Sequence, residues 1–290
     1  MIDLHLHSTA SDGLLSPEAL VQAAKREQLT TIALTDHDTL SGISRAASEA
    51  ATCGVELLTG VEISIAFLAY RDVHLLGYGI DPDNRLLNET LEQFAEARKK
   101  RSDAIIDRIN ESLRSEGRIP LDPMEVQSQA QGVLGRPHIG RALIKRGYVT
   151  TMEEAFNSYL RPCNVAKQYW DWQEAISAIH AAGGVAVLAH PVTITRDCEE
   201  LTELITRMAA GGLDGIEVMN NTALEHEVRH LQRCALALGL LMTAGSDFHG
   251  EPGPVRLGYG RNGFRFSDDL LPPLRERIRQ IRQHLSLYAP

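Results

Sequence analysis

The sequence predicts an α/β fold in which helices cover a parallel sheet. Short, almost continuously apolar runs such as 31–35 and 185–189 alternate with longer amphipathic segments, a pattern typical of strands buried on both faces by helices. A chain of 290 residues with 43% hydrophobic composition is long enough to bury a full core. One stretch, 84–165, breaks the alternation.

Seven strands are expected, at 2–7, 31–35, 55–64, 73–78, 185–189, 215–219 and 240–245. In the first, apolar and polar residues alternate with a period of two, so its two histidines share one face. Helices are expected at about 16–28, 41–53, 171–183, 197–210, 225–238 and 270–285. Seven strands fit a small or distorted barrel, although the pattern alone does not determine whether the sheet closes.

Residues 84–165 are predicted to form a helical insertion in the main domain. That domain would then comprise 1–83 and 166–290. A long amphipathic helix is predicted from 84 to about 117, because apolar residues recur near helical spacing at Leu87, Leu91, Phe94, Ile105, Ile109 and Leu113. Prolines and glycines divide the rest of this stretch into short pieces, with a turn entering a helix at 135–141 and a helix at 152–160.

Composition excludes several functions. The net charge of −9 argues against a broad surface that binds duplex DNA, but a small phosphorylated substrate remains compatible because metal ions reverse a local field. No apolar run is long enough to span a membrane, and the first residues lack the basic and apolar features of a signal peptide. The four cysteines are far apart in the sequence, so free thiols in the cytoplasm are expected.

Polar residues gather at or just past the ends of the predicted strands: His5, His7, His37, Glu62, His74, His190, Asp247 and His249, with Asp12 in the first loop. In β/α folds these ends lie on one face. Burying so many neighbouring polar groups without a cation costs several kcal/mol. By contrast His180, His226, His230 and His284 lie inside helical patterns and are interpreted as surface or packing residues.

This set of nitrogen and oxygen ligands without thiolate suits Mn²⁺, Zn²⁺ or Fe²⁺ better than Ca²⁺. Its size favours two or three ions, about 3.5 to 4 Å apart, which can bridge a hydroxide and hold a phosphate in line for hydrolysis. The sequence assigns no separate catalytic acid. Asp3, Asp36 and Asp38 either orient imidazole ligands or cap strand ends.

Six motifs resemble, in order and spacing, the polymerase and histidinol phosphatase (PHP) family: Asp3-Leu4-His5-Leu6-His7, Thr35-Asp36-His37-Asp38, Gly60-Val61-Glu62-Ile63-Ser64, Val73-His74-Leu75-Leu76-Gly77-Tyr78, Ala189-His190-Pro191 and Gly245-Ser246-Asp247-Phe248-His249. The resemblance implies a distorted seven-stranded β/α barrel with three metal ions. It also implies three ligand sets: His5, His7, Glu62 and Asp247; Asp12, His37 and His249; and Glu62, His74 and His190.

The insertion narrows the resemblance to phosphatases of 3',5'-bisphosphonucleosides, some of which also trim short RNA from its 5' end. That group carries Gly-Arg-x-His, here Gly135-Arg136-Pro137-His138. Arg136, His138 and the helix start are expected to clasp a second phosphate, the alternative being a solvated turn. Asn220, Ser8 and Arg161 are further candidate substrate contacts.

The expected reaction is removal of the 3'-phosphate from a substrate such as adenosine 3',5'-bisphosphate, with Mn²⁺ the first choice of metal. Alternatives are a 5'-to-3' exonuclease on short 5'-phosphorylated RNA and a phosphomonoesterase like histidinol phosphatase. An amidohydrolase of C–N bonds is less favoured, because Lys25, Lys99, Lys100, Lys145 and Lys167 do not end clear strands. A metal-binding module without activity is the remaining alternative. The sequence does not define an oligomeric state.

Overall fold

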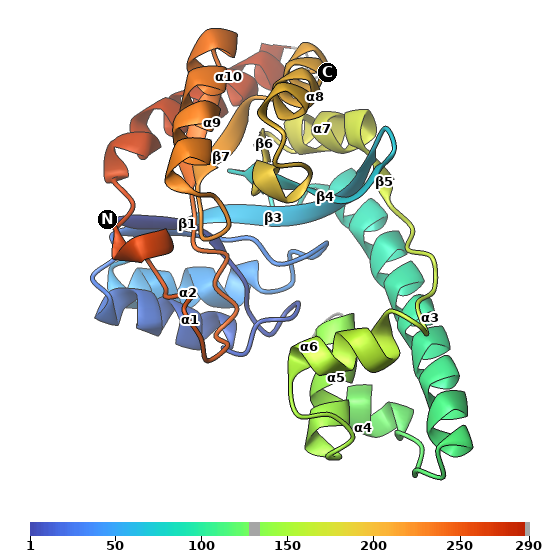
Figure 1. The fold of residues 1–290 in the computed structure, drawn as a ribbon. Helices are drawn as coiled ribbons and strands as arrows, with labels where there is room; N and C mark the ends of the chain where they lie inside the picture. Colours follow the sequence, from blue (N-terminus) through green and yellow to red (C-terminus); the bar gives the residue numbers. More distant parts are fainter. Residues whose placement is uncertain (128–133, 288–290) are drawn as a thin grey trace.

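The protein is built around one mixed sheet that curls into a nearly closed barrel (Figure 1). The computed structural model describes residues 1–127 and 134–287. The strands are β1 (Ile2–Leu6), β2 (Thr31–Leu34), β3 (Glu56–Phe67), β4 (Tyr70–Tyr78), β5 (Trp170–Asp171), β6 (Val185–Leu188), β7 (Gly215–Met219) and β8 (Leu241–Ala244). Seven of them follow the order β1-β2-β3-β4-β6-β7-β8, and the two-residue β5 pairs with β3. The predicted α/β class and seven-stranded barrel are confirmed.

Backbone hydrogen bonds bring the two ends of the sheet together. The segment after β8 lies beside β1, where the Asp247 amide donates to His5 O at 3.0 Å and the His7 amide donates to Phe248 O at 3.1 Å. Leu6 and Phe248 form a parallel bridge there. The first and last strands of the path therefore place His5, His7 and Asp247 side by side.

The expectation of a parallel sheet is wrong for β4, which runs antiparallel to both β3 and β6. The physical reason is the short connection between β3 and β4, which joins them as a hairpin, whereas a parallel neighbour needs a long crossover. β3 also continues to Phe67, beyond the predicted end at 64. Glu62 and Ser64 thus lie within β3, facing β4.

Helices cover the barrel on the outside. They are α1 (Pro17–Arg26), α2 (Ile43–Cys53), α7 (Trp172–Ala181), α8 (Cys198–Ala210), α9 (Glu225–Leu238) and α10 (Leu271–Leu287), with short 3-10 turns at Pro191–Thr193, Arg261–Gly263 and Asp268–Leu270. Figure 1 shows α1 and α2 on one side of β1 and β3, with α7 to α10 on the other. At the N-terminus of α1 the Ser16 hydroxyl accepts from the Ala19 amide at 3.2 Å and Pro17 opens the helix.

Between β4 and β5 the described chain is helical: α3 (Arg85–Ser115), α4 (Pro123–Gln127), α5 (Arg136–Lys145), α6 (Met152–Ala155) and a π-helical turn at Phe156–Leu160. Figure 1 shows α3 leading away from the sheet, with α4, α5 and α6 gathered beside it. From Ile105 onward these elements share a hydrophobic cluster that includes Ile109, Leu143 and Leu160 and is separate from the barrel cores, whereas Leu87 and Leu91 at the start of α3 pack in a barrel core. The separate core thus begins within α3, and the division at 84–165 stays a prediction. Within the described residues, no helix is long and apolar enough to cross a membrane.

Candidate metal centre

All nine residues expected to bind metal lie together at one end of the barrel. His5 is in β1 and His7 follows it, and His37 follows β2. Glu62 lies in β3 and His74 in the neighbouring strand β4. His190 follows β6, and Asp247 and His249 follow β8. Asp12 reaches the group from the loop after β1. Four overlapping groups have all their ligand atoms within 4.8 Å of one another: His7, Asp12, His37 and His249; His5, His7 and Asp247; His5, Glu62 and His190; and His37, Glu62 and His74.

Glu62 lies at the middle of this arrangement and is buried. Its Oε2 is 2.9 Å from His37 Nδ1, 3.3 Å from His7 Nε2 and 3.4 Å from His5 Nε2. Its Oε1 is 2.9 Å from His74 Nδ1 and 3.0 Å from His190 Nε2. A single carboxylate therefore faces five imidazoles.

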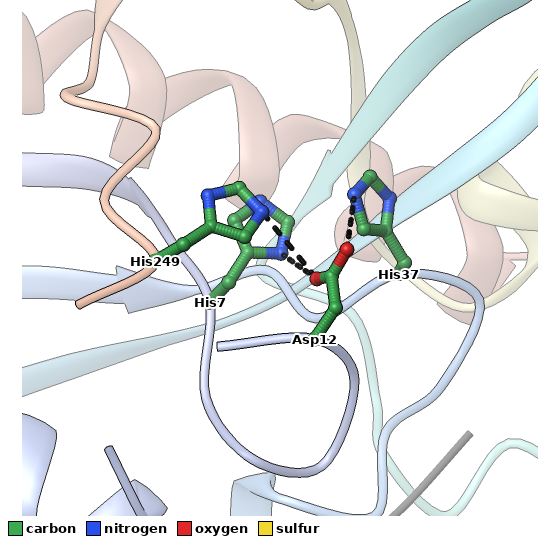
Figure 2. A group of neighbouring side chains, drawn as sticks. All are labelled: His7, Asp12, His37 and His249. Carbon is green, nitrogen blue, oxygen red and sulfur yellow. Dashed lines mark ion pairs between the residues drawn. The ribbon is translucent and has the colours of Figure 1, made fainter. Parts of the chain in front are cut away.

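Asp12 and Asp247 are the two carboxylates at the edge of the group. Figure 2 shows Asp12 between His37 and the stacked rings of His7 and His249. Asp12 Oδ1 is 3.4 Å from His249 Nε2, and Oδ2 is 3.9 Å from His37 Nε2. Asp247 Oδ1 lies 3.2 Å from His7 Nε2. Asp247 (φ 56°) and His190 (φ 28°) hold positive φ angles, a strained backbone typical of functional sites.

Several buried atoms here have no hydrogen-bond partner among the described residues: His5 Nε2, His7 Nδ1 and Nε2, His37 Nδ1 and Glu62 Oε2. Leaving a buried polar atom unpaired costs about 1–3 kcal/mol, and Glu62 Oε2 lies within 3.4 Å of three of the nitrogens, His5 Nε2, His7 Nε2 and His37 Nδ1. Divalent cations satisfy such lone pairs, and the nitrogen and oxygen donors fit Mn²⁺, Zn²⁺ or Fe²⁺. The residues present thus fit a metal centre.

Three imidazoles are anchored by their outer nitrogen, which leaves the other nitrogen facing the cluster. His249 Nδ1 lies 3.0 Å from Asp247 O, and His190 Nδ1 lies 3.0 Å from the Thr193 hydroxyl, which itself donates to His190 O. His5 Nδ1 lies 3.0 Å from Glu217 Oε1. An acceptor on the outer nitrogen fixes the tautomer and orientation of a metal-binding histidine.

Glu217 was not predicted as a site residue. It lies in the middle of β7 with 0% of its surface exposed. Its Oε1 meets His5, while its Oε2 accepts from the His190 amide at 2.8 Å and from Asn220 Nδ2 at 3.4 Å. The available signal was a carboxylate between Ile216 and Val218 in an apolar strand, because a buried charge needs partners.

The ionised state of Glu62 and the neutral state of His37 suit cation binding. Burial opposes ionisation of Glu62, but the neighbouring imidazoles hold its pKa well below the usual value. Burial lowers the pKa of His37 to about 4, against the attraction of Glu62 and Asp12. For His7 burial also acts to lower the pKa, but Asp247 and Glu62 raise it to about 10. A cation that takes His7 as a ligand therefore has to displace a proton, because only a neutral imidazole offers its lone pair.

Asp3, Asp36 and Asp38 fix the backbone around the cluster instead of orienting imidazoles. Asp3 accepts from the Ser246 and Gly258 amides at 2.8 and 2.7 Å. Asp36 accepts from the Ser8 amide at 2.7 Å and from the hydroxyls of Ser8 and Ser11 in the loop that carries Asp12. Asp38 accepts from the Ser64 amide at 2.9 Å. Of the two expectations for these residues, the structural one fits their contacts.

The five candidate substrate contacts lie in different surroundings. Arg136 Nη2 is 3.9 Å from Asp72, and its guanidinium lies over the Phe156 ring. His138 is buried, and its Nδ1 accepts from the Gly135 amide at 3.1 Å, so Nε2 carries the proton. The side chains of Ser8 and Asn220 are buried and hydrogen-bonded to Asp36 and to the Thr222–Ala223 turn. Arg161 is exposed and bonds to Asn157.

The helices between β4 and β5 contact the cluster's surroundings directly. Arg98 in α3 forms an ion pair with Asp38. Arg141 in α5 donates to Asp12 O at 2.9 Å and to Glu251 at 2.6 Å. Cationic side chains of this segment therefore reach the edge of a site that is rich in carboxylates.

A barrel with imidazoles and carboxylates converging at one end defines a metal-dependent hydrolase. The chain belongs to the PHP domain family, whose model matches residues 3–209. It is a metal-dependent phosphoric ester hydrolase. The resemblance found in the sequence motifs is thus confirmed.

Three similar proteins cover most of the chain. A 5'-3' exoribonuclease of Haemophilus influenzae is 36% identical over 88% of this chain and 92% of its own. A 3',5'-nucleoside bisphosphate phosphatase of Chromobacterium violaceum is 32% identical over 98% and 97%. A crystal structure from Bifidobacterium adolescentis, classed as a metal-dependent phosphoesterase, superposes with a TM-score of 0.83 at 29% identity, covering 95% of this chain and 96% of the other.

Proposed function

We propose that the nine clustered residues hold two or three divalent cations, with Mn²⁺ the first choice. His5, His7, Glu62 and Asp247 would hold one ion; Asp12, His37 and His249 a second; Glu62, His74 and His190 a third. The bound ions would supply Lewis acidity and an activated water for attack on phosphorus. The unpaired buried atoms of the cluster support this assignment.

The reaction that we assign to this centre is removal of the 3'-phosphate from a 3',5'-bisphosphonucleoside, which leaves the 5'-nucleotide and phosphate. The observation that carries the assignment is that arginines of the helical segment reach the surroundings of the cluster: Arg98 at Asp38, Arg141 at the Asp12 carbonyl and Arg136 at Asp72 in β4. A substrate with a second phosphate needs cationic side chains of this kind to bind that phosphate. The Chromobacterium violaceum relative, named for this activity, matches nearly the whole chain.

Residues 84–165 act in this proposal as an insertion over the metal centre. Arg136 binds the phosphate that is not hydrolysed, since a guanidinium forms two parallel hydrogen bonds to phosphate oxygens. His138 faces the substrate with Nε2–H, because the Gly135 amide already occupies Nδ1. Burial, followed by the nearby Arg141, lowers the pKa of His138, so it acts as a neutral donor.

A 5'-to-3' exonuclease acting on short 5'-phosphorylated RNA is the second candidate, and the Haemophilus influenzae relative favours it. The same metals and the same Arg136 would serve, with a phosphodiester cleaved instead of a monoester. Lys167, one of the lysines weighed for an amidohydrolase, contacts Ser64 and Asp72.

The test is a parallel assay of the Mn²⁺-loaded protein. Adenosine 3',5'-bisphosphate and a 5'-phosphorylated oligoribonucleotide are supplied separately, and phosphate release and nucleotide release are both measured. The phosphatase assignment expects phosphate and adenosine 5'-monophosphate from the first substrate, at a kcat/KM at least ten-fold above that for the second. Turnover of the oligonucleotide alone would overturn it in favour of the exonuclease.

A further inference from the structure

Asp12 reaches the metal centre from a loop that consists of turns between β1 and α1. The Gly13 amide donates to Ser8 O at 2.9 Å, which folds the loop back on itself. The Leu14 amide donates to His249 O at 2.7 Å. The loop therefore bonds both to itself and to the segment that carries another candidate ligand.

This loop is closely packed on its barrel side. A Cβ atom at Gly13 would lie 2.4 Å from His7 O, so the close approach of the two segments requires glycine. Asp36 holds the same side through the Ser8 amide and the Ser11 hydroxyl. The carbonyl of Asp12 is bonded instead by a residue from outside the barrel, Arg141 in α5.

Arg141 joins the helical segment between β4 and β5 to this loop. Its Nη2 donates to Asp12 O at 2.9 Å and to Glu251 Oε1 at 2.6 Å, and its Nε donates to Glu251 Oε1 at 3.0 Å. The Arg141 side chain is 20% exposed, whereas that of Glu251 is 48% exposed. An ion pair with so exposed a partner contributes little, whereas a hydrogen bond from a charged donor is one of the stronger kinds. We therefore expect the bond to Asp12 O to be the more important contact.

The two acceptors of Arg141 lie in two segments that carry candidate metal ligands. Asp12 is in one, and Glu251 follows His249 by two residues in the other. The two ligands face each other across a short gap, with Asp12 Oδ1 3.4 Å from His249 Nε2 (Figure 2). A side chain that bonds both segments at once fixes their separation. Contacts of this kind behind the ligands tune the affinity of a metal site.

We propose that Arg141 is a positioning residue for the second ion, the one assigned to Asp12, His37 and His249. The inference rests on the proposed function and extends it: the helical segment completes a metal centre whose ligands all lie in the barrel. A guanidinium suits this role because its rigid, planar set of donors serves two acceptors at once. The ions assigned to the strand ligands are supported inside the barrel, by Glu217 for instance, and do not depend on Arg141.

The test is a Mn²⁺ titration of the chelator-treated full-length protein, with free Mn²⁺ measured by electron paramagnetic resonance. Arg141→Gln is expected to raise the Kd of one class of sites at least ten-fold and to change the Kd of the others less than two-fold. Lys145→Gln is the matched control, since Lys145 lies on the same helix but pairs with Glu125 of the helical segment itself, at 3.2 Å. Unchanged binding in Arg141→Gln, equal weakening of all sites, or an equal loss in the control would overturn the positioning role.

Glu251→Gln separates the bond to Asp12 from the ion pair. The substitution removes the negative charge beside Arg141 but leaves the guanidinium and the Asp12 carbonyl in place. We expect the Kd of the second ion to change less than three-fold. A loss as large as that in Arg141→Gln would mean that the ion pair with Glu251 supports the ion, and the role assigned to the Asp12 bond would be wrong.

Hydrogen exchange distinguishes failure of this inference from failure of the proposed function, because it needs neither metal nor turnover. In metal-free protein, amides of residues 8–14 are expected to exchange at least five-fold faster in Arg141→Gln than in the wild type, while those of β7 are unchanged. If the wild type binds no Mn²⁺, the proposed metal centre fails, whereas faster exchange at 8–14 still supports the role of Arg141 in holding Asp12. Equal exchange in the two proteins refutes that role, whatever the centre binds.

Discussion

Replacing Glu217 by glutamine tests whether this buried carboxylate positions the metal ligands. In the native arrangement both carboxylate oxygens accept: Oε1 from His5 Nδ1, and Oε2 from the His190 amide. A glutamine side chain has an acceptor at one end only and presents two N–H donors at the other. Glu217→Gln therefore places a donor against either His5 or the His190 amide.

Each outcome weakens the metal centre. If the amide nitrogen faces His5, the proton of that imidazole moves to Nε2, which then no longer offers a lone pair to the cluster. If it faces His190, a buried backbone donor loses its acceptor, at a cost of about 1–3 kcal/mol. Changes of this kind next to a metal ligand reduce metal affinity about 10–100-fold, and we expect that range here.

The assay is the number of manganese ions retained per chain after dialysis against graded concentrations of chelator, measured by mass spectrometry. Glu227→Gln is the matched control, because Glu227 is also buried and accepts hydrogen bonds, from the Leu224 amide and Arg196, but lies in α9 away from the cluster. Retention by Glu217→Gln equal to the wild type, or equal losses in both variants, would refute the positioning role.

Three further results are expected. Arg136→Ala should raise KM for the bisphosphate at least ten-fold and change kcat less. His37→Ala should instead lower kcat and the amount of bound manganese together. Equal kinetic profiles for the two variants would contradict these separate roles. In wild-type enzyme, kcat/KM for the bisphosphate should fall as pH rises through about 8, because Lys167, which shares Asp72 with the phosphate-binding Arg136, loses its proton there. Lys167→Arg should move that fall to higher pH, and an unmoved profile would contradict a role for Lys167. Manganese at 100 times its Kd should stabilise the chelator-treated protein by about 2.7 kcal/mol, read as a rise in Tm, and an unchanged Tm would argue against metal binding in the folded state.

The sequence determined the set of residues at the centre. Imidazoles and carboxylates at strand ends converge in any β/α fold, so His5, His37, His190 and His249 were predicted together although they lie far apart in the chain. His74 differs, because it lies in the middle of β4 and not at its carboxyl end. It joins the others because β4 runs antiparallel to β3 and β6, a direction that the sequence pattern did not predict.

Only the tertiary structure decided which groups serve these ligands. In the sequence Glu217 resembles any polar residue of a strand, and only the barrel brings it to His5 and His190. Asp36 could equally have oriented an imidazole ligand, but in the structure its oxygens bond to Ser8 and Ser11. Hydrophobic periodicity reports which face of an element is buried. It carries no information on which distant side chain a buried carboxylate meets, because that depends on how the strands pair and where the barrel closes.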